Sequence, residues 1–175
     1  MKYLNYVYEV DCRYFRIVNK NFEKRFLHSF FRKITHLGSA SFTISIVLFL
    51  ILFSTGSTKL AVIASGIALA LSHIPVMLIK KFIPRKRPYL VLHDCHVTEN
   101  PLTDCSFPSG HTTAFFSIII PFCFYYSVLA IILLPLGFLV GLSRVYLGLH
   151  YPSDIVFGCL LGSLVGSVSF ILVFQ

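Results

Sequence analysis

Two long apolar runs follow a charged N-terminal segment in the first half of the chain. Residues 34–58 and 60–79 contain no Lys, Arg, Asp or Glu. About 20 apolar residues cross a bilayer as a helix, so these runs predict transmembrane helices at roughly 37–55 and 60–79. The sequence Ser-Thr-Gly-Ser-Thr at 54–58 is typical of a turn between them.

The apolar pattern continues in the second half. Residues 105–143 are again free of Lys, Arg, Asp and Glu, and this run is too long for one crossing. It predicts two helices, at about 109–125 and 129–146, joined by a tight turn. The segment 155–174 predicts a final helix, in which glycines at every fourth position would let a neighbouring helix approach closely.

The N-terminal segment has a different composition. Residues 1–33 contain eight Lys/Arg and three acidic residues among many aromatic side chains. Residues 22–33 form a basic, aromatic and roughly helical pattern, typical of a helix that lies along lipid headgroups; a partly ordered tail is the alternative. The expected fold is therefore an all-α integral membrane protein. An N-terminal interfacial segment, 1–36, precedes a bundle of about five transmembrane helices, 37–175.

Composition supports this class and narrows the partners. The chain is 56% hydrophobic and 13% charged, with a mean hydropathy of +0.79, whereas a soluble domain carries about 25% charged residues. No cleavable signal peptide is expected at the N-terminus. The net charge of +8 comes from cations that flank apolar runs. This placement predicts anionic lipid headgroups and phosphorylated substrates as partners, and no nucleic acid.

The five cysteines do not indicate a zinc site, because none of them forms a Cys-x-x-Cys pair. Cys95 and Cys105 lie ten residues apart in the polar loop 80–108. They would form a disulfide if that loop faces an oxidising compartment; two free thiols are the alternative.

Polar residues gather at the ends of the apolar runs, where ionisable groups are costly and tend to be functional. The order of the expected helices places all of these clusters on the N-terminal side of the membrane. There are three: Lys80-x6-Arg87-Pro88, Pro108-Ser109-Gly110-His111 and Ser143-Arg144-x3-Gly148-x-His150-x3-Asp154. They resemble the three signature motifs of the type 2 phosphatidic acid phosphatase (PAP2) superfamily, over roughly residues 40–170. One motif alone would be weak, but all three in order form a specific signal.

The resemblance implies that His150 is the nucleophile, which fits its chemistry. A neutral imidazole nitrogen can attack phosphorus and form a covalent phosphoryl-enzyme. Asp154 would hold the other ring nitrogen and stabilise the charge that develops on the ring. Pro152 fits an early helix position and leaves His150 just outside the helix start. A histidine packed structurally beside a helix cap is the alternative.

The second motif would supply proton transfer and phosphate contacts. His111 would protonate the leaving group and then act as base for the incoming water, because the ordinary pKa of histidine lies near neutrality. The backbone N–H groups of Ser109 and Gly110, with the Ser109 hydroxyl, would hold phosphate oxygens at a helix N-terminus. The alternative is that Pro-Ser-Gly is an ordinary helix-initiating sequence with no role in phosphate binding.

Lys80, Arg87 and Arg144 would bind the non-bridging phosphate oxygens. The planar guanidinium of arginine matches phosphate, and lysine acts as a point charge. Ser143 would support the loop. Three cations would neutralise the transition state, and there is no carboxylate cluster for Mg²⁺. We therefore expect neither a metal nor another cofactor.

Other polar residues nearby are not motif positions. Three cations are expected to touch lipid headgroups or solvent: Lys81, Arg85 and Lys86. Three carboxylates are expected to be solvated: Asp94, Glu99 and Asp104. Three further histidines are expected to be structural: His73, His93 and His96.

Together these features predict a membrane lipid phosphatase that works through a phosphohistidine. The short chain is similar to small bacterial undecaprenyl-diphosphate phosphatases, which recycle the carrier lipid of cell-wall synthesis. A glycerolipid phosphate, such as phosphatidylglycerophosphate or phosphatidic acid, is the alternative substrate. A non-catalytic binder or transporter of lipid phosphates is the alternative of another class, and it is disfavoured because binding alone needs no nucleophile. The oligomeric state is not encoded in these motifs.

Two signals disagree about the side of the membrane that the site faces. On the expected topology, 14 of the 15 Lys/Arg lie on the side of the site, and Lys59 lies opposite. The positive-inside rule would then place the site in the cytoplasm. The family resemblance implies the outer face, and several of these cations would bind phosphate rather than set topology. We favour the outer face.

Overall fold

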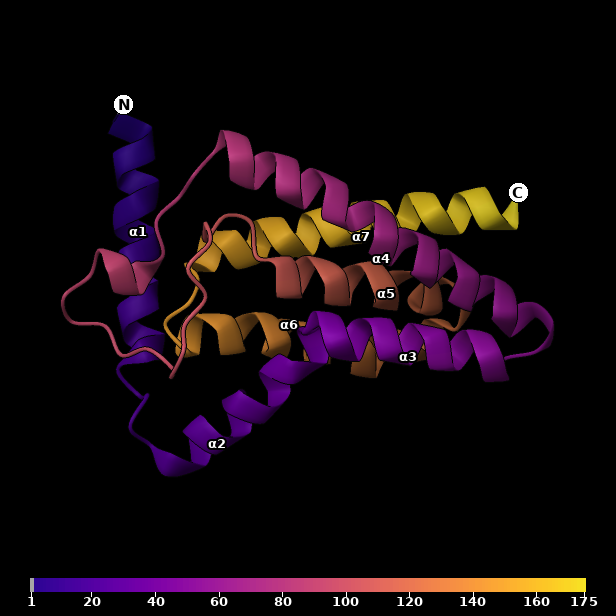
Figure 1. The fold of residues 1–175 in the computed structure, drawn as a ribbon, viewed down its shortest axis with the longest axis horizontal. Coiled ribbons are helices and arrows are strands. Elements are labelled where there is room, and N and C mark those ends of the chain that lie inside the picture. The colour runs from indigo at the N-terminus through magenta and orange to yellow at the C-terminus, as the bar shows by residue number, and fades with distance from the viewer. Residues whose placement is uncertain (1) are drawn as a thin grey trace.

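The computed structural model describes residues 2–175, with side chains from residue 6 onward. Within this range the chain is helical apart from caps, turns and one long loop, and no strand occurs there (Figure 1). The all-α class is therefore confirmed. The helices are, in order, α1 (Lys2–Asn19), α2 (Arg25–Ile34), α3 (Ala40–Phe53), α4 (Gly56–Phe82), α5 (Gly110–Tyr125), α6 (Ala130–Tyr146) and α7 (Pro152–Phe174).

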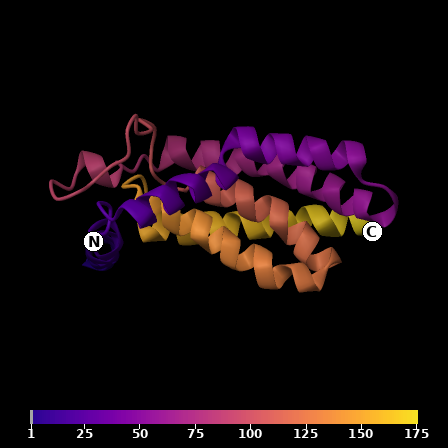
Figure 2. The same cartoon turned by 90° about the horizontal axis from the view of Figure 1, so that it is seen from below.

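Helix α5 forms the core of the bundle. Helices α3 to α7 run side by side along the long axis of the molecule (Figures 1 and 2), and α5 packs against each of the other four. Residues Thr112 to Ile119 are all buried. A helix that is apolar on every side is stable only when neighbours surround it, which explains why α5 has no charged residue in any turn.

The expected close approach along the last helix is confirmed. A Cβ atom added to Gly162 would lie 2.4 Å from the carbonyl oxygen of Thr113, so only a glycine lets α7 come this near to α5. Gly158 and Gly166 lie against the same helix. Because this contact spans α7, it fixes the start of α7 beside the start of α5, where two of the motifs lie.

Among the described residues, three helical segments are long and apolar enough to cross a membrane: Gly56–Phe82, Ser127–Tyr146 and Pro152–Phe174. Helix α3 passes the same test only together with Arg25–Gly38, from which it is bent by 54°. Its 14 residues extend about 21 Å, less than the roughly 30 Å of a hydrocarbon core. Helix α5, with 16 residues, is also short. Charge-free runs include caps and turns, so they overstate helix length.

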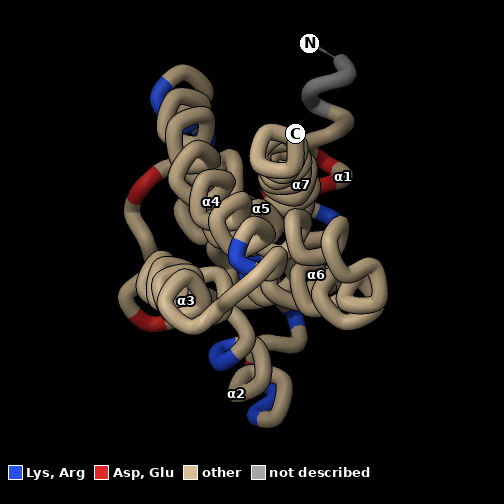
Figure 3. The backbone as a smooth tube through the Cα atoms, turned by 90° about the vertical axis from the view of Figure 1, so that its right-hand side faces the viewer, with Lys and Arg blue, Asp and Glu red and all other residues tan. Residues whose placement is uncertain are grey.

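The turn expected at 54–58 is shorter in the structure, because α4 already begins at Gly56. The helices expected at 109–125, 129–146 and 155–174 correspond to α5, α6 and α7. Figure 3 looks along the bundle, and the tube of helices α3 to α7 carries few charged positions. The charged residues are thus concentrated at the other end of the bundle, where α1 and the long loop lie (Figure 1).

Helix α1 lies across that polar end of the bundle and packs on α6 and α7 (Figure 1). The inner face of α1 buries Asp11, Cys12, Phe15 and Asn19. Two of these four side chains are polar and make specific hydrogen bonds, which is why the sequence shows no clean apolar stripe here.

Candidate active site

The helix ends bring the three motifs together, as the order of the helices predicts. Lys80 lies in the last turn of α4, and Arg87 follows that helix. Ser109 to His111 begin α5, Arg144 lies in the last turn of α6, and His150 and Asp154 flank the start of α7. Arg87 Nη1 lies 3.2 Å from His150 Nε2, and the Ser109 N–H donates to the Asp154 carbonyl oxygen over 3.2 Å. The first and second motifs thus both contact the third.

His150 is held in a buried turn that requires a glycine. Gly148 has a φ of +78°, and a Cβ there would lie 2.3 Å from the carbonyl oxygen of His96. The turn leaves His150 only 1% exposed. Burial lowers the pKa of His150 to about 4, and Arg144 and Arg87 add to this effect against the opposing influence of Asp154. The imidazole is therefore neutral at pH 7.

The hydrogen bond from Arg87 identifies the tautomer of His150. A guanidinium can only donate hydrogen bonds, so Nε2 of His150 accepts and carries the lone pair. The hydrogen of the neutral ring is then on Nδ1, which faces Asp154 Oδ2 at 3.4 Å. The lone pair belongs to the nitrogen that Arg87 now contacts.

Asp154 is fully buried in the first turn of α7. Its Oδ2 accepts the Tyr151 N–H over 2.9 Å, which caps the helix. The 3.4 Å contact with His150 Nδ1 lacks hydrogen-bond alignment, and Nδ1 has no other partner within the described residues. Hydrogen bonds between catalytic groups often tighten only when substrate binds. The pair is therefore in place to orient the imidazole.

Arg87 is completely buried, and every nitrogen of its guanidinium donates. Nε donates to the Asp104 carbonyl oxygen over 2.8 Å, Nη1 to the Leu149 carbonyl oxygen over 2.8 Å, and Nη2 to Asp104 Oδ1 over 2.6 Å. Lys80 binds the same Asp104 carboxylate. The Arg87 side chain therefore connects the long loop to the turn that carries His150.

Asp104 is not simply solvated, so that expectation was wrong. Its carboxylate is half-exposed but paired with Lys80 and Arg87. Partial burial would raise its pKa, but hydrogen bonds from Lys80 and Arg87 outweigh this and lower the pKa to about 2. Asp104 thus forms ion pairs with Lys80 and Arg87, two of the three cations expected to bind phosphate.

Arg144 is buried, with 3% of its surface exposed, yet its donors are mostly unused. Nη1 donates to Thr35 Oγ1 over 2.8 Å. Nε and Nη2 have no partner in the described part of the chain. A buried donor without an acceptor is costly, and these two N–H groups form the edge of a guanidinium that matches two phosphate oxygens. Arg144 is therefore suited to bind an oxyanion.

The second motif begins α5. The Ser109 hydroxyl caps the helix by accepting from the Thr112 N–H (3.4 Å) and hydroxyl (3.0 Å), and its own N–H is used by Asp154. The space around Gly110 is open, since a Cβ there would meet no atom within 4 Å. His111 lies against Gly38 and within electrostatic range of Arg144 and His150. The phosphate contacts expected from Ser109 and Gly110 therefore remain predictions. Ser109 already makes hydrogen bonds within the protein, whereas the space beside Gly110 is open.

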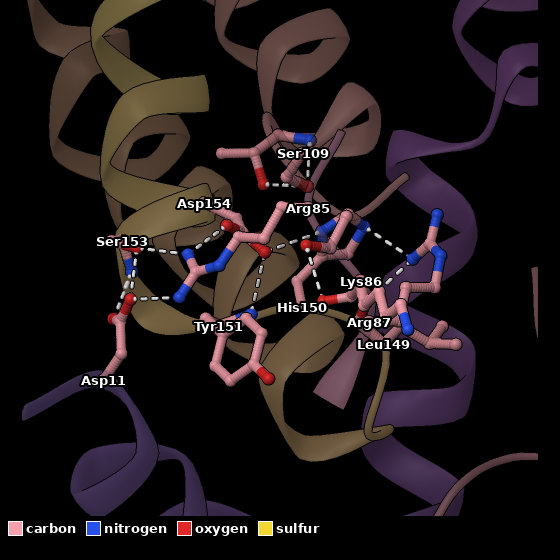
Figure 4. A network of polar contacts seen from close by, with 12 residues as sticks. Asp11, Arg85, Lys86, Arg87, Ser109, Leu149, His150, Tyr151, Ser153 and Asp154 are labelled. Atoms are coloured by element: carbon pink, nitrogen blue, oxygen red, sulfur yellow. Dashed lines mark hydrogen bonds and ion pairs between the residues drawn. The ribbon is translucent and has the colours of Figure 1, made fainter. Parts of the chain in front are cut away.

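Arg85 is a residue whose importance the motif pattern missed. The expectation that it contacts headgroups or solvent is wrong. Its Nη1 donates to Asp154 Oδ1 over 2.7 Å, and its Nη2 to Asp11 Oδ2 over 2.8 Å (Figure 4). Burial would lower its pKa, but Asp154 and Asp11 raise it. No local sequence signal marked Arg85, because its partner Asp11 lies in a charged stretch of α1, two positions from Glu9 and from Arg13.

His73 and His96 make contacts within the protein, whereas His93 is exposed and its expected structural role stays a prediction. His73 Nδ1 lies 3.1 Å from the Leu69 carbonyl oxygen, and the His96 ring stacks on Phe22. All five cysteines lie in the described range and are free thiols. Burial raises the pKa of Cys95 to about 11. No group of three or more His, Cys, Asp or Glu among the described residues is arranged to hold a metal ion.

A model of the PAP2 superfamily matches residues 61–175. Among curated proteins, the chain is 34% identical to the "bacitracin transport permease protein BcrC" of Bacillus licheniformis over 63% of this chain and 54% of that protein. It is 30% identical to the "undecaprenyl-diphosphatase BcrC" of Bacillus subtilis over 71% and 64%, respectively. The matched region thus spans between about half and two thirds of the length of these relatives.

Among solved structures, the chain resembles LpxE of Aquifex aeolicus with a TM-score of 0.80 and 32% sequence identity. The match covers 91% of this chain and 93% of that one.

Proposed function

The chain belongs to the PAP2 superfamily, and we propose that it is a membrane lipid phosphatase that works through a phosphohistidine on His150. One observation carries this proposal: a buried, neutral His150 has its lone pair on Nε2, next to Arg87 and within electrostatic range of the unpaired donors of Arg144. A nucleophile and an anion-binding edge thus lie at the same buried site.

In the first step, His150 Nε2 attacks the phosphorus atom. Its lone pair forms the new N–P bond while the bond from phosphorus to the leaving oxygen breaks. His111, which takes up a proton when the anionic phosphate binds beside it, gives that proton to the leaving oxygen. Arg144 holds two non-bridging oxygens through Nε and Nη2. Lys80 and Arg87 move from Asp104 to the remaining oxygens, with the N–H of Gly110 and the Ser109 hydroxyl at the helix start. Asp154 stabilises the charge on the ring.

In the second step, His111 removes a proton from water, and the resulting hydroxide attacks phosphorus. The N–P bond breaks, its electron pair returns to Nε2, and inorganic phosphate leaves. The three cations supply the positive charge that a metal supplies in other phosphatases. We therefore propose that the reaction is independent of metal ions and of other cofactors, so that treatment with a chelator should leave the rate unchanged.

The substrate is a lipid phosphate, and we propose undecaprenyl diphosphate first. Support comes from a relative named undecaprenyl-diphosphatase and from an apolar hollow of about 320 Å³ between α3, α5 and α6. Leu37 lines this hollow, and its neighbour Gly38 contacts His111. A hydrocarbon chain placed there would leave its headgroup near the histidines.

The proposal is tested by phosphate release from detergent-solubilised protein. Undecaprenyl diphosphate, phosphatidylglycerophosphate and phosphatidic acid are compared at equal concentration, with and without chelator. We expect the first to be hydrolysed fastest and His150→Ala to abolish release. A His150→Ala variant that releases phosphate as fast as the wild type would mean that the site binds or transports lipid phosphates without this chemistry.

We further propose that the site faces the outside of the cell membrane. Cys95 and Cys105 are half-buried thiols in the loop at the site end of the bundle. A membrane-impermeant thiol reagent should therefore label them in intact cells. Labelling that occurs only after lysis would place the site in the cytoplasm.

A further inference from the structure

We propose that Arg85 and Asp11 are positioning residues for this reaction: Asp11 on α1 fixes Arg85, and Arg85 fixes Asp154 behind His150. The inference rests on the proposed function, because it assigns Asp154 to the orientation of His150. It goes beyond it because neither residue belongs to the three motifs, and Asp11 lies outside the residues 61–175 that the family model matches.

The contact of Arg85 with Asp154 determines which way the carboxylate points. Oδ1 accepts from Arg85 Nη1 at 2.7 Å, and Oδ2 accepts the Tyr151 N–H at 2.9 Å. With one oxygen bound on each side, the carboxylate cannot rotate, and Oδ2 is left facing His150 Nδ1. Asp154 is also fully buried. A buried carboxylate without a cation is unstable as an ion, and Arg85 is the cation that contacts it.

Arg85 stands on a loop, so other groups must hold it in turn. Its Nη2 donates to Asp11 Oδ2 at 2.8 Å, and its Nη1 also donates to Ser153 Oγ at 2.8 Å. The Tyr151 ring covers one face of the guanidinium, with its centre 3.9 Å away. Two edges and one face of the group are therefore occupied by protein (Figure 4).

Asp11 in turn connects α1 to the start of α7. Its Oδ1 accepts the Ser153 N–H over 2.9 Å, and its Oδ2 accepts the Ser153 hydroxyl as well as Arg85. Asp11 is itself buried at 4% exposure. Helix α1 thus completes the active site from behind, so the N-terminal segment does more than rest on lipid headgroups.

Kinetics of four variants test this chain of contacts, with Lys86→Ala as the matched control that removes an exposed neighbouring cation. Arg85→Ala should lower kcat roughly 10- to 100-fold, the range found when a group that orients a metal-binding histidine is lost, with little change in KM. Asp11→Ala should lower kcat by a smaller factor. Arg85→Lys and Asp11→Asn should recover part of the loss, because each keeps one of the contacts.

Combined variants separate positioning from general damage. In an Asp154→Asn background, Arg85→Ala should cause no further loss of kcat, and Asp11→Ala should add nothing to Arg85→Ala. Gel filtration and thermal unfolding in detergent report whether each variant is folded. Losses that multiply, or a rise in KM with kcat intact, would overturn the proposal; the second result would mean that Arg85 binds the substrate phosphate itself.

A readout without substrate distinguishes failure of this inference from failure of the proposed function. In NMR spectra of ¹⁵N-histidine-labelled protein, the chemical shift of the His150 Nδ1–H, which faces Asp154, should be the same in the wild type and in Lys86→Ala, and should change in Arg85→Ala and Asp11→Ala. An unchanged Nδ1–H shift in Arg85→Ala would overturn the inference whatever the activity. Full activity of His150→Ala would overturn the proposed function, and the Nδ1–H shift would still decide the role of Arg85.

Discussion

Arg87 and Arg144 are both buried at the polar end of the bundle, but their surroundings differ. On the side of the long loop, each guanidinium nitrogen of Arg87 donates to the protein, and Asp154 behind His150 is likewise held on both oxygens. On the side of α6, Arg144 has Thr35 as its partner, and two of its nitrogens have none among the described residues.

Before substrate binds, this difference separates the groups that hold His150 in place from the donors that lack an acceptor among the described residues. A cation whose donors are all satisfied stabilises the fold, whereas buried donors without acceptors cost about 1–3 kcal/mol each. On the loop side, Arg87 and Asp154 therefore fix the tautomer and orientation of His150. On the α6 side, an oxyanion bound to Arg144 would supply acceptors for its unpaired donors and so remove that cost. A substrate phosphate should bind between Arg144 and His150, with its leaving oxygen toward His111.

The largest expected effect concerns the loop side. Asp154→Asn keeps the size of the side chain but removes its charge, so the Nδ1–H tautomer of His150 is no longer enforced. We expect kcat to fall roughly 10⁴-fold, as when the carboxylate of a catalytic triad is replaced by an amide, with KM nearly unchanged. Steady-state phosphate release measures both, and Asp94→Asn, at an exposed carboxylate in the loop, is the control. A change confined to KM would mean that Asp154 belongs to the binding side.

Arg144→Met should affect activity and stability in opposite directions. Losing this donor pair should lower kcat/KM roughly 10²- to 10³-fold. The free energy of unfolding should stay the same or rise, because an apolar side chain of similar length removes the cost of unpaired buried donors. Phosphate release and thermal unfolding in detergent measure the two effects. A clear loss of stability would show that Arg144 supports the fold and is not kept for a ligand.

Arg87→Met should destabilise the protein, in contrast to Arg144→Met. The change leaves the buried Leu149 carbonyl oxygen without its donor and releases Asp104 from the turn that carries His150. We expect the free energy of unfolding to fall by roughly 2–3 kcal/mol. Equal stability changes for the two methionine variants, measured side by side, would remove the distinction between the two sides of the site.

The sequence alone was sufficient to place the motif residues at one end of the bundle. His150 and Asp154 lie one helical turn apart, and the order of the apolar runs placed Lys80, His111 and Arg144 at the same end. This worked because the position of a helix end in a membrane bundle follows from counting crossings.

The residues that support the site were not predictable in this way. Thr35 and Arg85 each contact a motif residue from a different segment, and Asp11 contacts Arg85. Nothing in the local pattern of these three residues distinguishes them from solvated polar residues. Asp104 was misjudged for the same reason, because its ion pairs depend on how the long loop folds back over α4. Such contacts are set by tertiary structure, which single-sequence periodicity does not carry.

The smallest expected effect concerns Asp104, whose carboxylate pairs with Lys80 and Arg87 when no substrate is bound. The pKa of Asp104 is about 2, so at neutral pH it stays ionised, and only another anion can replace it on Lys80 and Arg87. Asp104→Asn should weaken this competition and lower KM by up to about fivefold, which corresponds to the roughly 1 kcal/mol of a partly exposed ion pair. The inhibition constant for inorganic phosphate should fall in parallel, with Asp94→Asn as the control. If KM rises instead, Asp104 holds Lys80 and Arg87 ready for the substrate, and the loop side orients the cations as well as the nucleophile.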